Sequence, residues 1–155
     1  MTAARIETAD ARRADVLASL HAACLEEAWP EEDIATLLRQ PGVFAALAVD
    51  AAPVGFLLWR IVADEAEILS LGVLPDARRH GIATALLETA VVSLMAGKVA
   101  SLFLEVAADN RGALAFYRTH GFGEVGRRSR YYRRAGGQDA DALVLKLTFP
   151  VGKRT

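Results

Sequence analysis

One stretch of this sequence, residues 72–90, constrains the fold more than any other. It reads as the end of a strand, a short charged turn and a long amphipathic helix. Leu74 and Pro75 end the strand, because proline lacks the backbone donor that a sheet ladder requires. After the turn, apolar residues recur at the spacing of one helical face, at Ala83, Leu86, Leu87, Ala90, Val91 and Leu94.

The chemistry that suits such a junction is anion binding. The first turn of a helix carries backbone N–H groups without intrahelical partners, at the positive end of the helix dipole. Gly81 would let a ligand approach the backbone, and Arg78 and Arg79 add positive charge. A phosphate or pyrophosphate fits these properties. An ordinary strand-to-helix connection with solvated arginines is the alternative at this point.

Composition narrows the class of protein. With 155 residues, 53% of them hydrophobic, the chain is expected to form one domain over residues 1–150 and a short tail at 151–155. The net charge of −1 argues against general binding to nucleic acid or membrane surfaces. Cys24 is the only cysteine, and no stretch resembles a signal peptide or membrane span. We therefore expect a cytoplasmic protein without a metal, membrane partner or direct nucleic-acid partner.

Hydrophobic periodicity predicts the remaining helices and strands. Helices are expected over residues 11–24, 30–40 and 111–120, besides the central helix that begins near residue 83. Strands are expected over residues 5–8, 43–49, 54–62, 67–73, 100–106, 122–132 and 142–147. The last two are joined by a glycine-containing loop at 133–141. Helices mixed with hairpins in this order predict an α+β fold.

Two residues that follow the central helix could transfer protons. Glu105 interrupts an apolar strand, and Tyr117 lies twelve residues further on, in the next helix. A carboxylate beside a hydrophobic core is desolvated, which makes it a better base near neutral pH. A tyrosine hydroxyl can protonate a leaving group. The alternatives are a strand-end carboxylate paired with an arginine and a core aromatic with a solvated tip.

Other kinds of site lack their motifs or a sufficient set of ligands. The sequence contains no G-x-G-x-x-G, no G-x-x-x-x-G-K-[ST] and no G-x-S-x-G. His21 and Cys24 have a ligand-like spacing, but no further cysteine or histidine lies nearby to complete a metal site. The basic run at 126–134 could stack on RNA, although alternation along an antiparallel strand explains much of it.

Residues 72–90 and 104–122 together resemble the GNAT superfamily of acyl-CoA-dependent N-acetyltransferases. The turn matches that superfamily's pyrophosphate loop, [QR]-x-x-G-x-[GA], at Arg78, Gly81 and Ala83. The pattern N-x-x-A-x-x-x-Y-x-x-x-G-F follows downstream, at Asn110, Ala113, Tyr117, Gly121 and Phe122. The resemblance covers nearly the whole chain. It implies a GNAT-like fold, with a mixed central sheet of about six to seven strands flanked by about four helices.

Within that superfamily the chain is similar to the RimI branch, the ribosomal-protein alanine N-acetyltransferases. The shared features are Trp29 in a Trp/Pro/acidic segment, Leu104-Glu105-Val106 before the asparagine turn, the pair Tyr131-Tyr132, and Asp141-Ala142 before the last strand. The loop after Tyr132 departs from that branch, in which a proline and a slightly shorter loop follow the tyrosines. The resemblance implies an acyltransferase that moves an acetyl group from acetyl-CoA to the N-terminal alanine of a small-subunit ribosomal protein.

The resemblance also implies a role for individual residues. Glu105 would be the general base, directly or through water, and Tyr117 the general acid for the departing thiolate. The backbone of Leu71, Gly72 and Val73 would hold the pantetheine arm, and Asn110 would contact the coenzyme. The pyrophosphate would bind at Arg78, Arg79, His80, Gly81, Ile82, Ala83 and Thr84, and the acceptor N terminus at Trp29, Tyr131 and Tyr132.

An α-amine suits a site with a single carboxylate base. An α-amino group titrates near 7.7–8.0, so roughly a tenth is already neutral at pH 7, whereas lysine titrates near 10.4. No well-placed nucleophile is evident, so we expect direct attack within a ternary complex, by a monomer or weak dimer. A GNAT enzyme for a small-molecule amine or lysine, and a non-catalytic acyl-CoA-binding module, are the alternatives.

Overall fold

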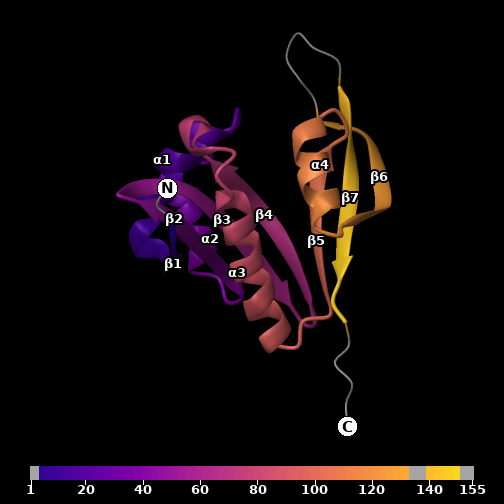
Figure 1. The fold of residues 1–155 in the computed structure, drawn as a ribbon, viewed down its shortest axis with the longest axis horizontal. Helices are drawn as coiled ribbons and strands as arrows, with labels where there is room; N and C mark the ends of the chain where they lie inside the picture. The colour runs from indigo at the N-terminus through magenta and orange to yellow at the C-terminus, as the bar shows by residue number, and fades with distance from the viewer. Residues whose placement is uncertain (1–3, 133–138, 151–155) are drawn as a thin grey trace.

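The computed structural model of the chain describes residues 4–132 and 139–150, and their strands form one sheet (Figure 1). Its order is β1-β2-β3-β4-β5-β7-β6, in which β4 and β5 are parallel and every other neighbouring pair is antiparallel. The α+β class and the mixed sheet predicted from the sequence are confirmed. The strands are β1 (Arg5–Ala9), β2 (Val43–Asp50), β3 (Ala52–Val62), β4 (Glu65–Val73), β5 (Ser101–Ala107), β6 (Gly123–Tyr132) and β7 (Ala140–Thr148).

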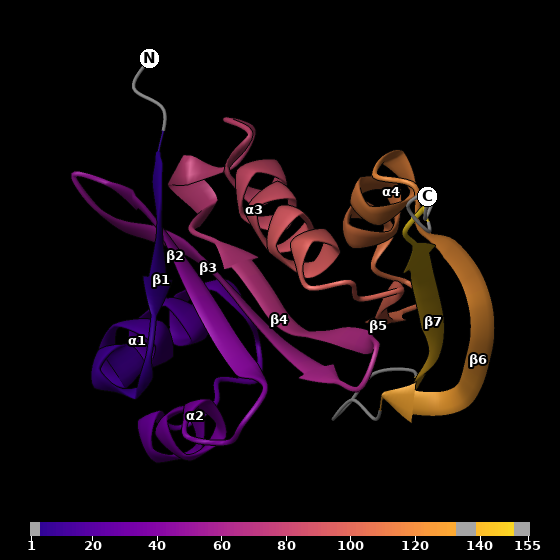
Figure 2. The ribbon, with the colours of Figure 1, turned by 90° about the horizontal axis from the view of Figure 1, so that it is seen from below.

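Two pairs of helices cover the two faces of the sheet. Figure 2 shows α1 and α2 on one face and α3 and α4 on the other. The helices are α1 (Ala14–Cys24), α2 (Glu31–Leu38), α3 (Ile82–Ala96) and α4 (Arg111–Thr119), with short 3-10 turns η1 (Ala11–Arg13) and η2 (Pro75–Ala77). Each pair buries its own apolar cluster against the sheet, as the separate cores around Leu17 and Leu86 show.

The sheet opens between β4 and β5. These strands pair at only three positions, from Glu65↔Ser101 to Glu67↔Phe103, and then diverge (Figure 1). On its other edge β4 pairs with β3 as far as Val73, and β5 pairs with β7 along its whole length. The inner edges of both strands therefore carry backbone groups that no sheet partner uses beyond the third pair.

Alternation along β5 directs its side chains to different faces, as the sequence predicts. Leu102, Leu104 and Val106 are buried in the core beneath α3 and α4. Phe103 and Glu105 are half-buried and lie on the opposite face. The strand thus places a carboxylate on the face that α1 and α2 leave uncovered next to β5 (Figure 2).

Some predicted boundaries differ from the structure. The turn between β2 and β3 was expected over residues 50–53, but Asp50 already pairs with Ala52. Ala51 alone makes the turn, in a left-handed conformation with a φ of 62°. The turn before β4 likewise uses Ala63, with a φ of 56°, and Glu65 belongs to the strand. Asp10 caps the short turn η1, where it accepts a hydrogen bond from the Arg12 N–H, so α1 begins only at Ala14.

None of the described helices is long and apolar enough to cross a lipid bilayer. Longest among them is α3, with 15 residues.

Gly72 provides a stability test of how closely α1 packs on β4. A Cβ atom at residue 72 would lie 2.7 Å from Phe56 Cε1 and 2.8 Å from Cys24 Cβ, both closer than real contacts allow. We expect Gly72→Ala to lower the free energy of unfolding by about 1–3 kcal/mol, the usual cost of overpacking. Urea unfolding measures this change.

Gly123→Ala is the matched control, because a Cβ at residue 123 would meet no atom within 4 Å. Its effect should stay within about 0.5 kcal/mol, as for other exposed substitutions. Equal stability of the two variants would contradict the close approach of α1 to β4.

Candidate active site

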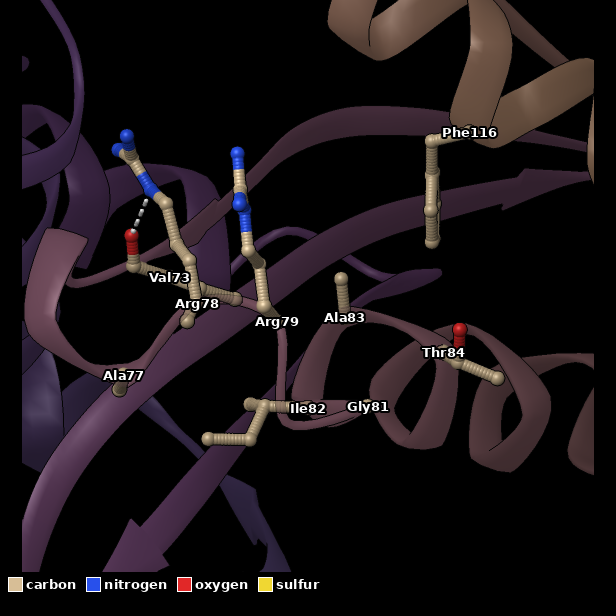
Figure 3. Close-up of a pocket in the computed structure, with 9 residues that line it drawn as sticks. All are labelled: Val73, Ala77, Arg78, Arg79, Gly81, Ile82, Ala83, Thr84 and Phe116. Carbon is tan, nitrogen blue, oxygen red and sulfur yellow. Dashed lines mark hydrogen bonds between the residues drawn. The ribbon is translucent and has the colours of Figure 1, made fainter.

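A pocket of about 230 Å³ lies where the first turn of α3 faces α4. Figure 3 shows Arg78 and Arg79 extending in the same direction at one end, and Phe116 of α4 opposite Ala83 and Thr84. The pocket brings together most of the predicted anion-binding loop. Its lining consists of Val73, Ala77, Arg78, Arg79, Gly81, Ile82, Ala83, Thr84 and Phe116. His80 is exposed and does not belong to that lining.

The conformation of the loop leaves the start of α3 open. Gly81 caps the helix in the left-handed region, with a φ of 77° and no side-chain capping bond. A Cβ at this position would meet nothing within 4 Å, so the backbone angle rather than space favours glycine. The N–H groups of the first turn are therefore available to an anion, and the helix dipole favours one there.

Arg78 joins this loop to the end of β4. Its Nε donates a hydrogen bond to the Val73 carbonyl oxygen at 3.0 Å (Figure 3). The preceding residues form η2, and Arg79 is itself left-handed, with a φ of 68°. The loop is thus folded back on the strand, and Arg78 and Arg79 line the same pocket as the first turn of α3.

The predicted pantetheine strand lies at the open edge of the sheet. Leu71, Gly72 and Val73 pair with β3 on one side and have no ladder partner in β5 on the other. Val73 also lines the pocket. An extended ligand arm at this edge could therefore make strand-like hydrogen bonds while its anionic end lies at α3.

Tyr117 is buried at the inner face of α4. Its ring packs edge-on against Phe116 and Phe122, with centroids 5.2 and 5.3 Å apart. Burial raises the pKa of the Tyr117 phenol well above its ordinary value, so the hydroxyl stays protonated. Among the described residues this hydroxyl has no hydrogen-bond partner. The side chain is a core aromatic, and it also holds a proton that it can donate.

Asn110 is placed by its role as the N-cap of α4. Its Oδ1 accepts a hydrogen bond from the Ala113 N–H at 3.2 Å. The side-chain NH₂ group makes no hydrogen bond to the described residues and remains a possible donor to a ligand.

Glu105 forms an ion pair with an arginine, which was the alternative interpretation from the sequence. Its Oε1 lies 3.1 Å from Arg128 Nη2 on β6, and its side chain is 22% exposed. Arg127 pairs in the same way with Asp141 at 2.8 Å. Two arginines of the basic run at 126–134 thus have structural partners, which favours the strand interpretation over RNA binding.

The proposed acceptor residues are only partly described. Trp29 is half-buried in the connection between α1 and α2. Its backbone N–H donates a hydrogen bond to His21 Nδ1 at 3.2 Å. Its indole stacks on the His21 ring at a centroid distance of 4.6 Å. Tyr131 and Tyr132 end β6, but their side chains, like residues 133–138, lie outside the described part of the structure.

Sequence reasoning missed two residues near the pocket. Phe116 lines it, and His120 lies 3.2 Å from Thr84 Oγ1 through its Nε2. Both follow Ala113 at the i+3 and i+7 spacing of one helical face, which could have indicated them. Elsewhere, His21 of α1, considered from the sequence for its ligand-like spacing to Cys24, is buried and positions Trp29. In the described residues no three potential ligands gather into a metal site.

Comparison with known proteins adds independent evidence. The sequence profile of the Acetyltransferase (GNAT) family matches residues 14–122. The [ribosomal protein bS18]-alanine N-acetyltransferase of Escherichia coli (strain K12) is 34% identical over 119 residues, 77% of this chain and 80% of the relative.

Solved structures agree with this relationship. The crystal structure of the ribosomal-protein-S18-alanine N-acetyltransferase from Escherichia coli superimposes with a TM-score of 0.87 at 27% identity, over 94% of this chain and 93% of the other. Arabidopsis thaliana NAA60 in complex with acetyl-CoA superimposes with a TM-score of 0.82 at 21% identity, over 94% and 98% of the two chains. The second likeness concerns the fold alone.

These matches define the class of protein. The chain belongs to the GNAT family of acetyltransferases, whose enzymes use acetyl-CoA. The superfamily predicted from the pyrophosphate loop and the asparagine–tyrosine pattern is confirmed, as is the similarity to the RimI branch.

The buried His21 predicts a loss of stability in acid. Burial lowers its pKa below the ordinary 6.5, so the folded chain resists a proton that the unfolded chain accepts. The stability from neutral His21 is therefore complete above pH 6.5 and decreases as the pH falls toward the lower folded-state pKa. Urea unfolding at pH 7 and pH 5.5 should show this decrease.

His21→Asn should make stability depend less steeply on pH over this range, because its side-chain oxygen can still accept from Trp29 but does not titrate. The exposed His80→Asn serves as the control and should keep the wild-type slope. Identical slopes in wild type and His21→Asn would count against this role of His21.

Proposed function

We propose that this chain is an acetyl-CoA-dependent N-α-acetyltransferase whose acceptor is the N-terminal alanine of the small-subunit ribosomal protein bS18. The observation that supports the chemistry is that the uncapped start of α3 and the end of the unpaired edge of β4, at Val73, line one pocket. Phe116 of α4 lines the same pocket, and the next residue, Tyr117, has a buried hydroxyl that stays protonated. The choice of acceptor is supported by the 34% identity to the [ribosomal protein bS18]-alanine N-acetyltransferase of Escherichia coli.

The pocket residues fit the anionic and extended parts of coenzyme A. The first-turn N–H groups of α3, with Arg78 and Arg79, would bind the pyrophosphate. The backbone of Leu71, Gly72 and Val73 would hold the pantetheine arm as an added strand, and the Asn110 amide would contact it. Bound in this way, acetyl-CoA supplies an activated thioester.

Proton transfer would take place from both faces of the sheet. Tyr117 lies in the core beneath α3 and α4, whereas Glu105 lies on the other face. A C–N bond forms to the acceptor amine as the C–S bond breaks. Glu105 would take the amine proton, directly or through water, and Tyr117 would give its proton to the leaving sulfur. Arg128 holds the Glu105 carboxylate in place.

The lone cysteine is a poor candidate for a covalent intermediate. Burial raises the pKa of the Cys24 thiol, although nearby Arg78 opposes this shift. A thiol that stays protonated is a weak nucleophile. Direct attack of the amine within a ternary complex is therefore the mechanism we propose.

The acceptor would enter between the α1–α2 connection and the end of β6. Trp29 and the two tyrosines Tyr131 and Tyr132 would surround its N terminus. A ribosomal acceptor would place the reaction in the cytoplasm. The departure of the loop after Tyr132 from the RimI pattern motivates an alternative, a GNAT enzyme for a small-molecule amine or lysine.

Two matched peptides test the choice of acceptor. One begins with the N-terminal residues of bS18, and the other has the same sequence with a blocked N terminus and a free lysine. Incubation with acetyl-CoA should add one acetyl group to the first peptide only, located at its α-amine by tandem mass spectrometry.

Acetylation of the blocked peptide instead would support a lysine acceptor. Binding of acetyl-CoA without acetylation of either peptide, and without acetylation of small-molecule amines, would support a non-catalytic module. Either result would reject the proposed function.

Two substitutions test the catalytic roles. Glu105→Gln should lower kcat with little change in coenzyme affinity, since the base acts on the acceptor. Tyr117→Phe keeps the buried ring and should slow turnover by about 10²-fold, a usual effect of losing a general acid. Steady-state kinetics and CoA binding measure both effects.

The exposed Glu124→Gln on β6 controls for the loss of a carboxylate and should keep wild-type kinetics. Thermal unfolding of each variant checks that the fold persists. Wild-type turnover in Glu105→Gln and Tyr117→Phe would remove both residues from the mechanism.

A further inference from the structure

His120 connects the two helices that border the pocket. It follows the last residue of α4 and is half-buried. Its Nδ1 lies 2.8 Å from the Phe116 carbonyl oxygen, and its Nε2 lies 3.2 Å from Thr84 Oγ1 in the first turn of α3. Both Thr84 and Phe116 line the pocket. The imidazole thus ties together residues from the two opposing walls.

These contacts determine the direction of both hydrogen bonds. A carbonyl oxygen only accepts, so Nδ1 must carry a proton. In the neutral ring Nε2 then has only a lone pair, and the Thr84 hydroxyl must donate to it. Thr84 is left with its backbone N–H, rather than its hydroxyl proton, to offer to an anion. The bridge therefore orients the Thr84 side chain as well as joining α3 to α4.

The position of this bridge lets it fix the separation of the two pocket walls, α3 and α4. The strands beneath the two helices diverge after three pairs, so no sheet hydrogen bonds join β4 to β5 beyond Glu67 and Phe103. Apolar residues of α3 and α4, such as Leu87 and Leu114, share one core cluster, but such packing is not directional. Within the described residues, Thr84–His120 is the one hydrogen bond that links α3 to α4.

We propose that His120 is a positioning residue for coenzyme binding, holding α4 against the first turn of α3 through Thr84. The inference rests on the proposed coenzyme site. It adds that the width of this site is set by a side chain that need not touch the coenzyme. Loss of the bridge would let the walls separate, so the start of α3 and the inner face of α4 would no longer meet one ligand at the same time.

Two substitutions at residue 120 separate this role from general packing. His120→Asn places an amide NH₂ where Nδ1 lies and keeps the bond to Phe116, but it is too short to reach Thr84. His120→Gln reaches further and can restore an acceptor for the Thr84 hydroxyl. Isothermal titration calorimetry with CoA, kinetics with acetyl-CoA and thermal unfolding are measured for the full chain.

His120→Asn should raise the Kd for CoA and the KM for acetyl-CoA by about three- to tenfold, the effect of losing one hydrogen bond. Its kcat at saturating acetyl-CoA should stay within about twofold of wild type, since the proton-transfer groups remain. His120→Gln should recover most of the affinity. Thr84→Val removes the same bond from the other side and should weaken binding to a similar extent.

The double variant provides the sharpest outcome. If the two residues act through their mutual bond, His120→Asn should weaken CoA binding no further in the Thr84→Val background. Wild-type affinity in His120→Asn, equal weakening by Asn and Gln, or additive losses in the double variant would each overturn the positioning role alone. Absence of CoA binding by the wild-type chain would overturn the proposed function and this role with it.

Discussion

The early divergence of β4 from β5 is the constraint on which the rest of the structure depends. Each strand is fully paired on its outer edge, so only their inner edges are free after the third pair. In a continuous sheet these groups would bond to each other and leave no place for a ligand. Because they do not, an extended molecule can lie between them with one end at the start of α3.

Two ionisable residues from neighbouring elements, Tyr117 of α4 and Glu105 of β5, lie in different environments. Tyr117 points into the core, where burial raises its pKa and preserves its proton. Glu105 of β5 lies on the face of the sheet that the helices leave uncovered, where it pairs with Arg128. In the proposed mechanism this separation keeps the acid and the base from exchanging a proton with each other.

Local signals predicted most of the elements, and tertiary contacts decided the remainder. Proline after β4, periodic leucines in α3 and the asparagine cap of α4 are encoded within a few residues, so they could be recognised in sequence. The order β5-β7-β6, the Glu105–Arg128 pair and the Thr84–His120 bond join distant segments and leave no local pattern. Turns near Ala51 and Ala63 were predicted, but their bounds were not. Alanine rarely adopts a positive φ, and the tightness of the hairpins imposes one at these two residues.

Gly72 lies on the strand that faces both α1 and the open edge of the sheet. Its missing side chain admits Cys24 and Phe56 on the α1 face, while its inner edge remains open toward β5. His21 lies one turn before Cys24, contacts Phe56 and holds Trp29. The connection that would receive the acceptor is therefore fixed through α1 to the strand that would hold the thioester. In the proposed site, close packing of this kind would set the distance between the two substrates before either binds.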